Sequence, residues 1–386
     1  MINITDKTRC TGCTACMNVC PSGCIQMRED AEGFLYPVAD TSACISCGGC
    51  LSVCPFNLSS DNMPRRACAV RTPHEDTSSS GGAVSWLSDR WIAEGGVVYG
   101  AAFDEDLTVC HIKADSSEGL QRLKTSKYVQ SRLDGIFTSV RRTLDDGERV
   151  LFIGTPCQVA GLKSFLGNES CGNILTIQLA CHGVPAPKLW KRYLESVNKM
   201  AGDKVMNVNF RDKSAGWKNY RIAFQGTSSH MSRAFDKDTY MLAYLQNLSL
   251  RPSCYHCDFR ANVYADILAG DLWNISEVMP EQDNGRGVTL VAAGSEKGQE
   301  IIERTFVAAG LVLSAPVSLE KATVRNSGFG GVIDVPEHRD KFFEGLYDSD
   351  DVMSYMDRFV YRPSQFRLLC QKIRSFLSRI KRRIVG

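Results

Sequence analysis

The chain has 386 residues, 44% of them hydrophobic and 17 of them cysteine, and a formal net charge of +2, which suggests two or three globular domains. Residues 364–386 carry seven cations and no acid, so the rest of the chain is net acidic, which excludes a nucleic-acid-binding body. No stretch approaches the roughly 18 apolar residues of a membrane span. No apolar signal segment precedes Cys10, so this many cysteines predict a reducing, cytoplasmic setting.

The N-terminal segment contains two cysteine runs with identical spacing, C-x2-C-x2-C-x3-C-P. Their cysteines are Cys10, Cys13, Cys16 and Cys20, followed by Pro21, and Cys44, Cys47, Cys50 and Cys54, followed by Pro55. Bacterial ferredoxins bind two 4Fe–4S clusters with this spacing, and the fourth cysteine of each run ligates the other cluster. We therefore assign one cluster to Cys10, Cys13, Cys16 and Cys54, and the other to Cys44, Cys47, Cys50 and Cys20. A disulfide-rich module or a zinc site is the alternative. Zinc sites usually pair two CxxC units, and disulfides require an oxidising compartment.

The next segments predict a hairpin, a linker and a helix. Residues 28–38 are expected to form a hairpin between the two cluster loops, and residues 56–80 a linker in which only Ala67–Arg71 resembles a strand. Ser80-Gly81-Gly82 then opens a helix over residues 83–94. Free N–H groups at such a helix start favour a phosphate, whereas a serine cap with glycines for tight packing is the alternative interpretation.

The region from residue 97 to residue 293 predicts an α/β domain with a mixed, partly parallel sheet. A strand over 97–103 precedes a polar loop at 123–131 and a helix that contains Ile136, Val140 and Leu144. The strands 150–153 and 174–179 flank a helix over 158–166, and their continuous apolar runs are typical of parallel strands covered on both faces. The remaining expected elements are strands within 203–235, a helix over 237–249, a strand over 287–293, a helix over 295–309 and mostly helix beyond 335.

Four further cysteines are expected to lie near one edge of that sheet. Cys157 and Cys181 each follow a parallel strand, so both lie at the carboxyl edge, where open α/β sheets bind ligands. Cys254 and Cys257 form a CxxC pair just before a strand at 265–271. These four thiols predict a third iron–sulfur cluster, a zinc site or unrelated buried thiols.

The other cysteines and the nearby histidines have ordinary interpretations. His182 and His256 lie beside the four cysteines and are expected to be hydrogen-bonded rather than metal-bound. The cysteines without a partner at metal spacing are read as small buried or surface thiols; they are Cys24, Cys68, Cys110, Cys171 and Cys370. No G-x-G-x-x-G follows a strand, and no Gly-Lys-[Ser/Thr] junction is present, which argues against a Rossmann nucleotide site and an ATP phosphate loop.

Several of these segments resemble the coenzyme F420 hydrogenase/dehydrogenase beta-subunit family. The similar segments are SSGGAVSW (79–86), TSKY (125–128), GTPCQVAG (154–161), CHGVP (181–185), CYHCDF (254–259) and ADILAGD (265–271). Members of that family are iron–sulfur flavoproteins, so the resemblance implies FAD and a third 4Fe–4S cluster. The implied ligands of that cluster are Cys157, Cys181, Cys254 and Cys257, with zinc as the rival occupant. The implied flavin contacts are Ser80, Gly81, Gly82, Lys127, Tyr128 and Asp266. Lys127 would place positive charge near the flavin ring, and its alternative interpretation is a solvated surface lysine.

The resemblance leads to a domain division and a function. We expect a 2x 4Fe–4S ferredoxin-type α+β module at 1–57, a linker at 58–78, an α/β FAD domain at 79–345 and a helical, basic tail at 346–386. The expected function is an oxidoreductase that passes electrons between FAD and 4Fe–4S clusters, with no side-chain acid or base assigned. The alternatives are a non-catalytic electron-transfer subunit of a larger complex and a redox sensor without flavin.

Partners and location follow from the same reading. An electron-carrier protein or a reduced cofactor is the expected partner, with a partner oxidoreductase subunit in the alternative, and an anaerobic cell suits the clusters. Apolar residues recur at helical spacing in 364–386 opposite the seven cations. This pattern predicts a helix that lies on the inner face of the membrane or docks on a partner, whereas a helix packed on its own body is the plainer alternative.

Overall fold

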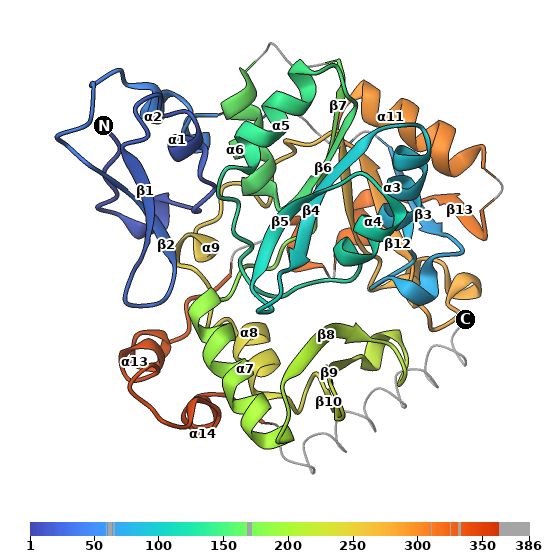
Figure 1. Cartoon of the computed structure of the whole chain (residues 1–386). Helices are drawn as coiled ribbons and strands as arrows, with labels where there is room; N and C mark the ends of the chain where they lie inside the picture. Colours follow the sequence, from blue (N-terminus) through green and yellow to red (C-terminus); the bar gives the residue numbers. More distant parts are fainter. Residues whose placement is uncertain are drawn as a thin grey trace.

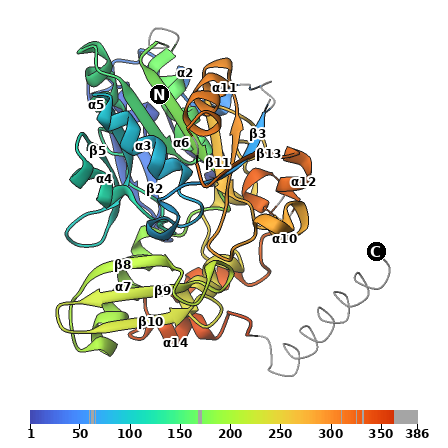
Figure 2. The ribbon, with the colours of Figure 1, turned by 90° about the vertical axis from the view of Figure 1, so that its right-hand side faces the viewer.

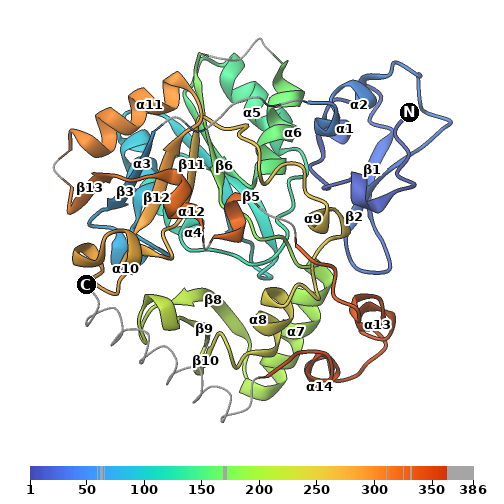
Figure 3. The same cartoon turned by 180° about the vertical axis from the view of Figure 1, so that it is seen from behind.

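The computed structural model describes residues 1–58, 60, 64, 66–167, 172–309, 311–324, 326–330 and 333–362. Figure 1 shows an N-terminal module beside a large sheet, with a smaller sheet and its helices below them. Figures 2 and 3, turned by 90° and 180°, keep the small sheet below the large one. Among the described residues, no helix is long and apolar enough to cross a membrane. The predicted helix at 364–386 lies outside the described residues.

The N-terminal module has the predicted hairpin between two short helices. Strands β1 (Ile25–Glu29) and β2 (Leu35–Ala39) pair antiparallel. Helices α1 (Ala15–Asn18) and α2 (Gly49–Ser52) begin inside the two cysteine runs. The duplicated sequence therefore gives a duplicated structure, and the expected α+β module is confirmed.

The large sheet has eight strands in the order β13-β3-β12-β11-β7-β6-β4-β5. The four central strands run parallel to one another; they are β4, β6, β7 and β11. The outer strands pair antiparallel with their neighbours: β5 with β4, β12 with β11, β3 with β12 and β13 with β3. The mixed, partly parallel sheet is therefore confirmed. The strands are β3 (Ala67–Arg71), β4 (Val97–Phe103), β5 (Val109–Ala114), β6 (Val150–Gly154), β7 (Ile174–Leu179), β11 (Ile267–Asp271), β12 (Thr289–Ala293) and β13 (Leu313–Pro316).

Helices cover both faces of this sheet because its strands alternate their buried side chains. Val97 and Tyr99 face α5 (Ile136–Asp145) and α6 (Pro156–Leu166). Val98 faces the opposite cluster, which also contains residues of the three other helices. These are α3 (Ala83–Ala93), α4 (Ser117–Leu123) and α11 (Glu296–Ile302). The continuous apolar strand runs thus have the expected cause, which is burial on both faces.

The smaller sheet carries a separate aromatic core. Its antiparallel strands are β8 (Val205–Asp212), β9 (Arg221–Gly226) and β10 (His230–Ala234). The core includes the fully buried side chains of Trp190, Tyr193, Phe210 and Tyr240. The helices that pack here are α7 (Pro187–Ala201), α8 (Thr239–Leu245), α13 (Arg339–Glu344) and α14 (Val352–Asp357). Shorter helices elsewhere are α9 (Pro252–Tyr255), α10 (Ile275–Val278) and α12 (Leu319–Thr323).

The expected linker at 58–78 needs a correction. Its strand-like stretch is β3, which lies between β12 and β13 in the large sheet, and all five of its residues are buried. The chain therefore enters the main sheet before the glycine-rich helix start. Ala67–Arg71 was recognisable as a strand from its apolar residues, but its place in the sheet depends on β12 and β13, which come from the far end of the domain in sequence.

Candidate functional site

The two cysteine loops fold alike, as the repeat predicts. Thr14 and Gly12 have positive φ angles of 65° and 69° in the first loop. In the second loop, Gly48 is equivalent to Thr14 and Ser46 to Gly12, and their φ angles are 77° and 56°. Left-handed residues at alternate positions curl a loop tightly, which turns its three cysteines toward one side.

The first group of predicted ligands surrounds a small cavity. This cavity is lined by all four assigned cysteines, Cys10, Cys13, Cys16 and Cys54, together with apolar side chains such as Met27 and Phe56. Burial, together with the neighbouring thiols of Cys10 and Cys54, raises the pKa of the Cys16 thiol to about 12. The donor set and the apolar lining fit a cluster held by four thiolates from both runs.

The second group is more exposed, and it includes a cysteine that the spacing did not assign. Cys50 is buried, Cys20 and Cys44 pack against the same small core, and Cys47 is exposed. Cys24 lies in this core too, with its sulfur 3.4 Å from the sulfur of Cys20. Cys24 is thus a buried thiol, as the sequence predicted, and it contacts one of the assigned ligands. Cys171 and Cys370 lie outside the described residues, and Cys68 and Cys110 lie on β3 and β5.

The third group of four cysteines is brought together at the carboxyl edge of the large sheet. Thr155 caps α6 through a reciprocal capping box with Gln158, which places Cys157 in the first turn directly after β6. Cys181 follows β7, and Cys254 lies in α9. Burial, together with neighbouring thiols of the group, raises the pKa of Cys157 to about 12 and that of Cys254 to about 11. Burial also raises the pKa of Cys181, which interacts with all three others.

Zinc is the alternative occupant of these four thiols. Among the described residues, no set of three or more His, Cys, Asp and Glu side chains is arranged to hold one metal ion. A single zinc ion would need all four sulfurs at about 2.3 Å. A 4Fe–4S cluster is likewise held by four thiolates, so the donor set suits either group.

The third group lies directly beside the first. Cys157 contributes to the raised pKa of Cys13, after burial and the thiols of Cys16 and Cys10. Helix α6, which carries Cys157, packs against the first loop so closely that a Cβ added at Gly161 would lie 2.9 Å from the Cys13 sulfur. Two motifs that are distant in sequence therefore form adjacent sites.

Aromatic side chains continue from the third group into the small-sheet half of the molecule. Burial raises the pKa of Tyr244 well above its ordinary value, with smaller contributions that include Cys181 and Cys254. The ring of Tyr244 stacks on Tyr128 with centroids 4.9 Å apart. The Tyr128 hydroxyl accepts a hydrogen bond from Nη1 of Arg211 at 3.2 Å. Arg211 is buried and paired with Asp271 at 3.3 Å.

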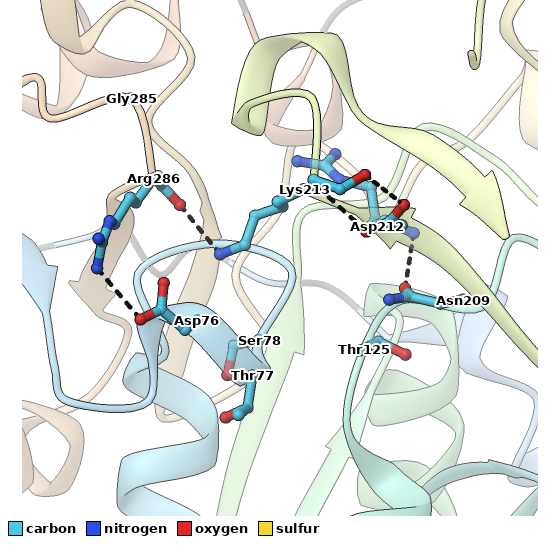
Figure 4. Close-up of a pocket in the computed structure, with 11 residues that line it drawn as sticks. Asp76, Thr77, Ser78, Thr125, Asn209, Asp212, Lys213, Gly285 and Arg286 are labelled. Atoms are coloured by element: carbon cyan, nitrogen blue, oxygen red, sulfur yellow. Dashed lines mark hydrogen bonds and ion pairs between the residues drawn. The ribbon is translucent and has the colours of Figure 1, made fainter. Parts of the chain in front are cut away.

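Arg211 also lines a polar cavity of about 320 Å³ (Figure 4). This volume is at the lower end of the usual range for ligand sites. Lys213 donates to the carbonyl of Arg286 at 3.0 Å and to that of Ser80 at 3.3 Å, and Arg286 pairs with Asp76 at 3.2 Å. The full lining is Asp76, Thr77, Ser78, Thr125, Asn209, Arg211, Asp212, Lys213, Ser214, Gly285 and Arg286.

The predicted helix-start motif lies beside this cavity but not in its wall. A Cβ at Gly81 would lie 2.7 Å from the backbone nitrogen of Thr289, and one at Gly82 would lie 2.6 Å from Oγ1 of Thr72. The Ser80 hydroxyl donates to the carbonyl of Val288 at 2.9 Å. The glycines thus allow close packing against β3 and β12, as the alternative interpretation held, while Ser78 just before them lines the cavity.

Lys127 and Asp266 have structural partners. The Lys127 ammonium donates to the carbonyls of Leu123, Lys124 and Thr125 at 2.8–3.2 Å, which closes the end of α4. Burial lowers the pKa of Lys127 to about 7. Asp266 lies before β11, at the edge of the sheet opposite to Cys157 and Cys181. Its carboxylate accepts from Thr176 and Ser295 at 2.7–2.9 Å. Of the predicted flavin contacts, Tyr128 accepts a hydrogen bond from Arg211 and the carbonyl of Ser80 accepts one from Lys213, and both of these cations line the cavity.

Of the two histidines beside the third group, His182 has the hydrogen bonds that the sequence analysis expected. His182 is hydrogen-bonded through Nε2 to Oδ1 of Asn247 at 2.7 Å and through Nδ1 to Oγ of Ser327 at 3.1 Å. His256 is exposed.

Sequence reasoning missed the basic wall of the cavity. Arg211 and Lys213 are two positions apart at the end of β8 and therefore point to one side, which is the pattern that a search for alternating charge would have detected. Arg286 comes from a separate loop much later in the chain, and no local signal connects it with them.

Two family models match parts of the chain. Residues 147–318 match the family model that describes the C terminus of the coenzyme F420 hydrogenase/dehydrogenase beta subunit. Residues 9–58 match the model of a 4Fe–4S dicluster domain, so the chain is an iron–sulfur protein with two 4Fe–4S clusters.

The chain was also compared with solved structures and with curated proteins. A chain of the F420-reducing [NiFe] hydrogenase complex from Methanosarcina barkeri is similar in structure, with a TM-score of 0.49 and 16% sequence identity. That match covers 76% of this chain and 97% of the hydrogenase chain. Among curated proteins, no sequence matches the chain.

Proposed function

We propose that the chain is an iron–sulfur flavoprotein oxidoreductase, which passes electrons between a two-electron substrate or hydride carrier at FAD and one-electron 4Fe–4S clusters. One observation carries this proposal: the third cysteine group lies between Cys13 of the dicluster domain and the Tyr244–Tyr128 stack that leads to the polar cavity. The substrate is not specified by any side chain in the cavity.

The chain's own residues would hold and position the cofactors. A bound FAD exchanges two electrons with a substrate and single electrons with clusters, and each cluster carries one electron. Arg211 and Lys213 supply positive charge on one wall of the cavity, which suits the FAD pyrophosphate. The cavity would hold part of a dinucleotide rather than all of it. Tyr128 fixes Arg211 by a hydrogen bond, and its ring stacks on Tyr244, which interacts with Cys181.

The third cysteine group would hold the cluster nearest to the flavin. Cys157, Cys181, Cys254 and Cys257 are four thiols with no competing carboxylate described among them. Burial raises the thiol pKa of Cys157, Cys181 and Cys254, so binding of a cluster would release protons from them, and the neighbouring cations Arg251 and Arg260 oppose that effect of burial at Cys254.

A second candidate function is that of a non-catalytic electron-transfer subunit. The second cysteine loop favours it, because Ile45 is 65% exposed, Leu51 is 46% exposed and Cys47 is exposed beside them. Exposed apolar side chains around a redox site suit contact with a protein partner. The family description also names beta subunits. Sustained turnover by the isolated chain would exclude this candidate.

Anaerobic cofactor analysis tests the proposal. Iron, sulfide, zinc and released flavin are measured per chain for the wild type, for Cys181→Ala and for the control Cys68→Ala, a buried cysteine on β3. We expect about twelve irons, no zinc and one FAD in the wild type and in the control, and about eight irons in Cys181→Ala. About eight irons with one zinc and no flavin in the wild type would contradict the flavoprotein and leave an electron-carrying subunit.

A further inference from the structure

Arg251 is a buried cation between the first and third cysteine groups. Its side chain is only 1% exposed and is among the largest fully buried side chains. Nε donates to the carbonyl of Cys10 at 2.8 Å, and Nη2 lies 3.8 Å from the Cys10 sulfur. Nη1 donates to Oε1 of Gln130 at 3.0 Å, and Nη2 also donates to the carbonyl of Leu35 at 3.0 Å.

No carboxylate partner of Arg251 is found among the described residues, which distinguishes it from the buried Arg211 and Arg339. Arg211 pairs with Asp271, and Arg339 pairs with Glu32. The Arg251 guanidinium instead lies over the ring of Tyr36, with 4.1 Å between the guanidinium carbon and the ring centroid. A buried charge without a counter-charge is costly, so this position calls for negative charge nearby. Thiolates that ligate a cluster beside Cys10 would supply it.

The backbone of Arg251 belongs to the segment that carries the third group. Its N–H donates to the carbonyl of Val184 at 3.0 Å, and its carbonyl accepts from the N–H of Cys254 at 2.9 Å. At Cys157 and Cys254, burial raises the thiol pKa and the charge of Arg251 opposes that rise. One side chain thus connects the ligand segment of the third group to the ligand loop of the first.

The first loop is shaped to leave room for this contact. Gly12 has a φ of +69°, and a Cβ there would lie 3.1 Å from Nη1 of Arg251 and 3.0 Å from Nε2 of Gln130. Gln130 in turn donates to the carbonyl of Thr11 at 3.0 Å. The guanidinium is therefore enclosed by the loop, by Gln130 and by the β1–β2 hairpin, and its orientation is fixed.

We propose that Arg251 is the positioning residue that sets the reduction potential of the cluster held by Cys10, Cys13, Cys16 and Cys54 and joins it to the third group. Reduction adds negative charge to a cluster, and a fixed cation next to a ligand sulfur stabilises that charge. Arg251 therefore raises the potential of the first cluster above the value that the same four thiolates would give alone. Its effect on the first cluster depends only on the dicluster domain, whereas the junction with the third group rests on the proposed function.

The test is a potentiometric titration of the full chain under anaerobic conditions, followed by electron paramagnetic resonance. We compare wild type with Arg251→Met, Arg251→Lys and Arg339→Met; Arg339 is matched in burial and also ties the N-terminal module to the body, through Glu32. In Arg251→Met we expect the oxidised form of one cluster to be favoured at least tenfold, a fall of at least about 59 mV for one electron. Arg251→Lys should keep most of the wild-type potential, and Arg339→Met should keep all potentials.

A second variant covers the case in which Arg251→Met binds no iron. Gln130→Glu places a carboxylate 3.0 Å from Nη1 and neutralises the charge without removing the side chain. It should lower the potential of the same cluster. Unchanged potentials in Arg251→Met and Gln130→Glu at wild-type iron content would overturn the proposal, as would equal falls in Arg251→Lys and Arg251→Met. Because the readout is the first cluster, the outcome is separate from whether flavin or a third cluster is bound.

Discussion

The sulfur atoms of Cys20 and Cys24 lie 3.4 Å apart, at the edge of the core that also contains Cys44 and Cys50. Only Cys20 has the ferredoxin spacing. Two thiols therefore lie near the second cluster where the sequence pattern provides for one, and the structure alone ranks neither of them above the other as a ligand.

The spacing decides between them, and this gives the first prediction. Cys20→Ala should lose about four irons per chain, because the second cluster loses a ligand, whereas Cys24→Ala should keep the wild-type iron content. Iron and sulfide analysis of anaerobically purified protein measures both. If Cys24→Ala lost the iron and Cys20→Ala retained it, the ligand would be Cys24 and the assignment of the fourth ligand would be wrong.

The side chains whose convergence the sequence predicted depend on local spacing. The four predicted ligands of the first group are ferredoxin-spaced cysteines, and they line one cavity. Cys157 and Cys181 follow parallel strands, whose apolar runs made the edge of the sheet recognisable. In both cases a short pattern fixes the backbone, and the backbone fixes where the side chains lie.

The parts that the sequence did not predict depend on distant partners. The family resemblance implied that Asp266 contacts the flavin. Its carboxylate instead accepts hydrogen bonds from Thr176, which lies on a different strand. Lys127 lies in a polar loop, yet its ammonium is occupied by carbonyls at the end of α4, a helix that the sequence analysis did not predict. The cavity is built from four separate segments, and no sequence window contains more than one of them.

A buried histidine predicts how stability depends on pH. His111 on β5 is 5% exposed; its Nε2–H donates to the carbonyl of Ile153 at 3.0 Å, and Nδ1 lies 2.7 Å from Oγ of Ser131. Burial lowers its pKa from 6.5 to about 4. Between these values the unfolded chain binds a proton that the folded chain does not, so the free energy of unfolding falls as pH falls from 6.5 to 4, by up to about 3 kcal/mol.

The variant His111→Gln isolates this contribution, because glutamine keeps an N–H donor and does not titrate. Denaturant unfolding followed by tryptophan fluorescence gives the difference in unfolding free energy between wild type and variant at each pH. We expect the wild type to lose stability relative to the variant below pH 6.5. A difference that stays constant down to pH 4 would show that the imidazole is not held neutral.

The basic wall of the cavity predicts a difference between two flavins. Lys213→Met should weaken FAD binding about tenfold, or about 1.4 kcal/mol, because it removes one positive charge beside the pyrophosphate position. Riboflavin lacks phosphate, so its affinity should not change. Lys218→Met is the matched control, since Lys218 pairs with Asp283 at 3.0 Å and does not line the cavity.

Fluorescence titration of flavin-depleted protein measures both affinities for the three proteins. Equal weakening of FAD and riboflavin by Lys213→Met would mean that the lysine supports the fold rather than the phosphates. An unchanged FAD affinity in Lys213→Met would exclude this cavity as the pyrophosphate site.

The contact between α6 and the first cysteine loop predicts an unusual sign for a glycine substitution. In a helix interior, alanine is ordinarily more stable than glycine by roughly 1 kcal/mol. At Gly161 the added Cβ would lie 2.9 Å from both Cβ and the sulfur of Cys13, which is closer than such atoms approach in proteins. Either α6 or the first loop must then move, and both carry predicted cluster ligands, Cys157 and Cys13.

We therefore expect Gly161→Ala to lower the thermal unfolding midpoint and to reduce iron by about four per chain or more. Gly135→Ala is the control, because Gly135 precedes α5 with a φ of −85° and no atom lies within 4 Å of the position that an added Cβ would take. Thermal unfolding and iron analysis are run on the same anaerobic preparations. Full iron content and a raised midpoint in Gly161→Ala would mean that α6 and the first cysteine loop are not in close contact. The first and third groups would then not be adjacent, and electron transfer between them would lose its structural basis.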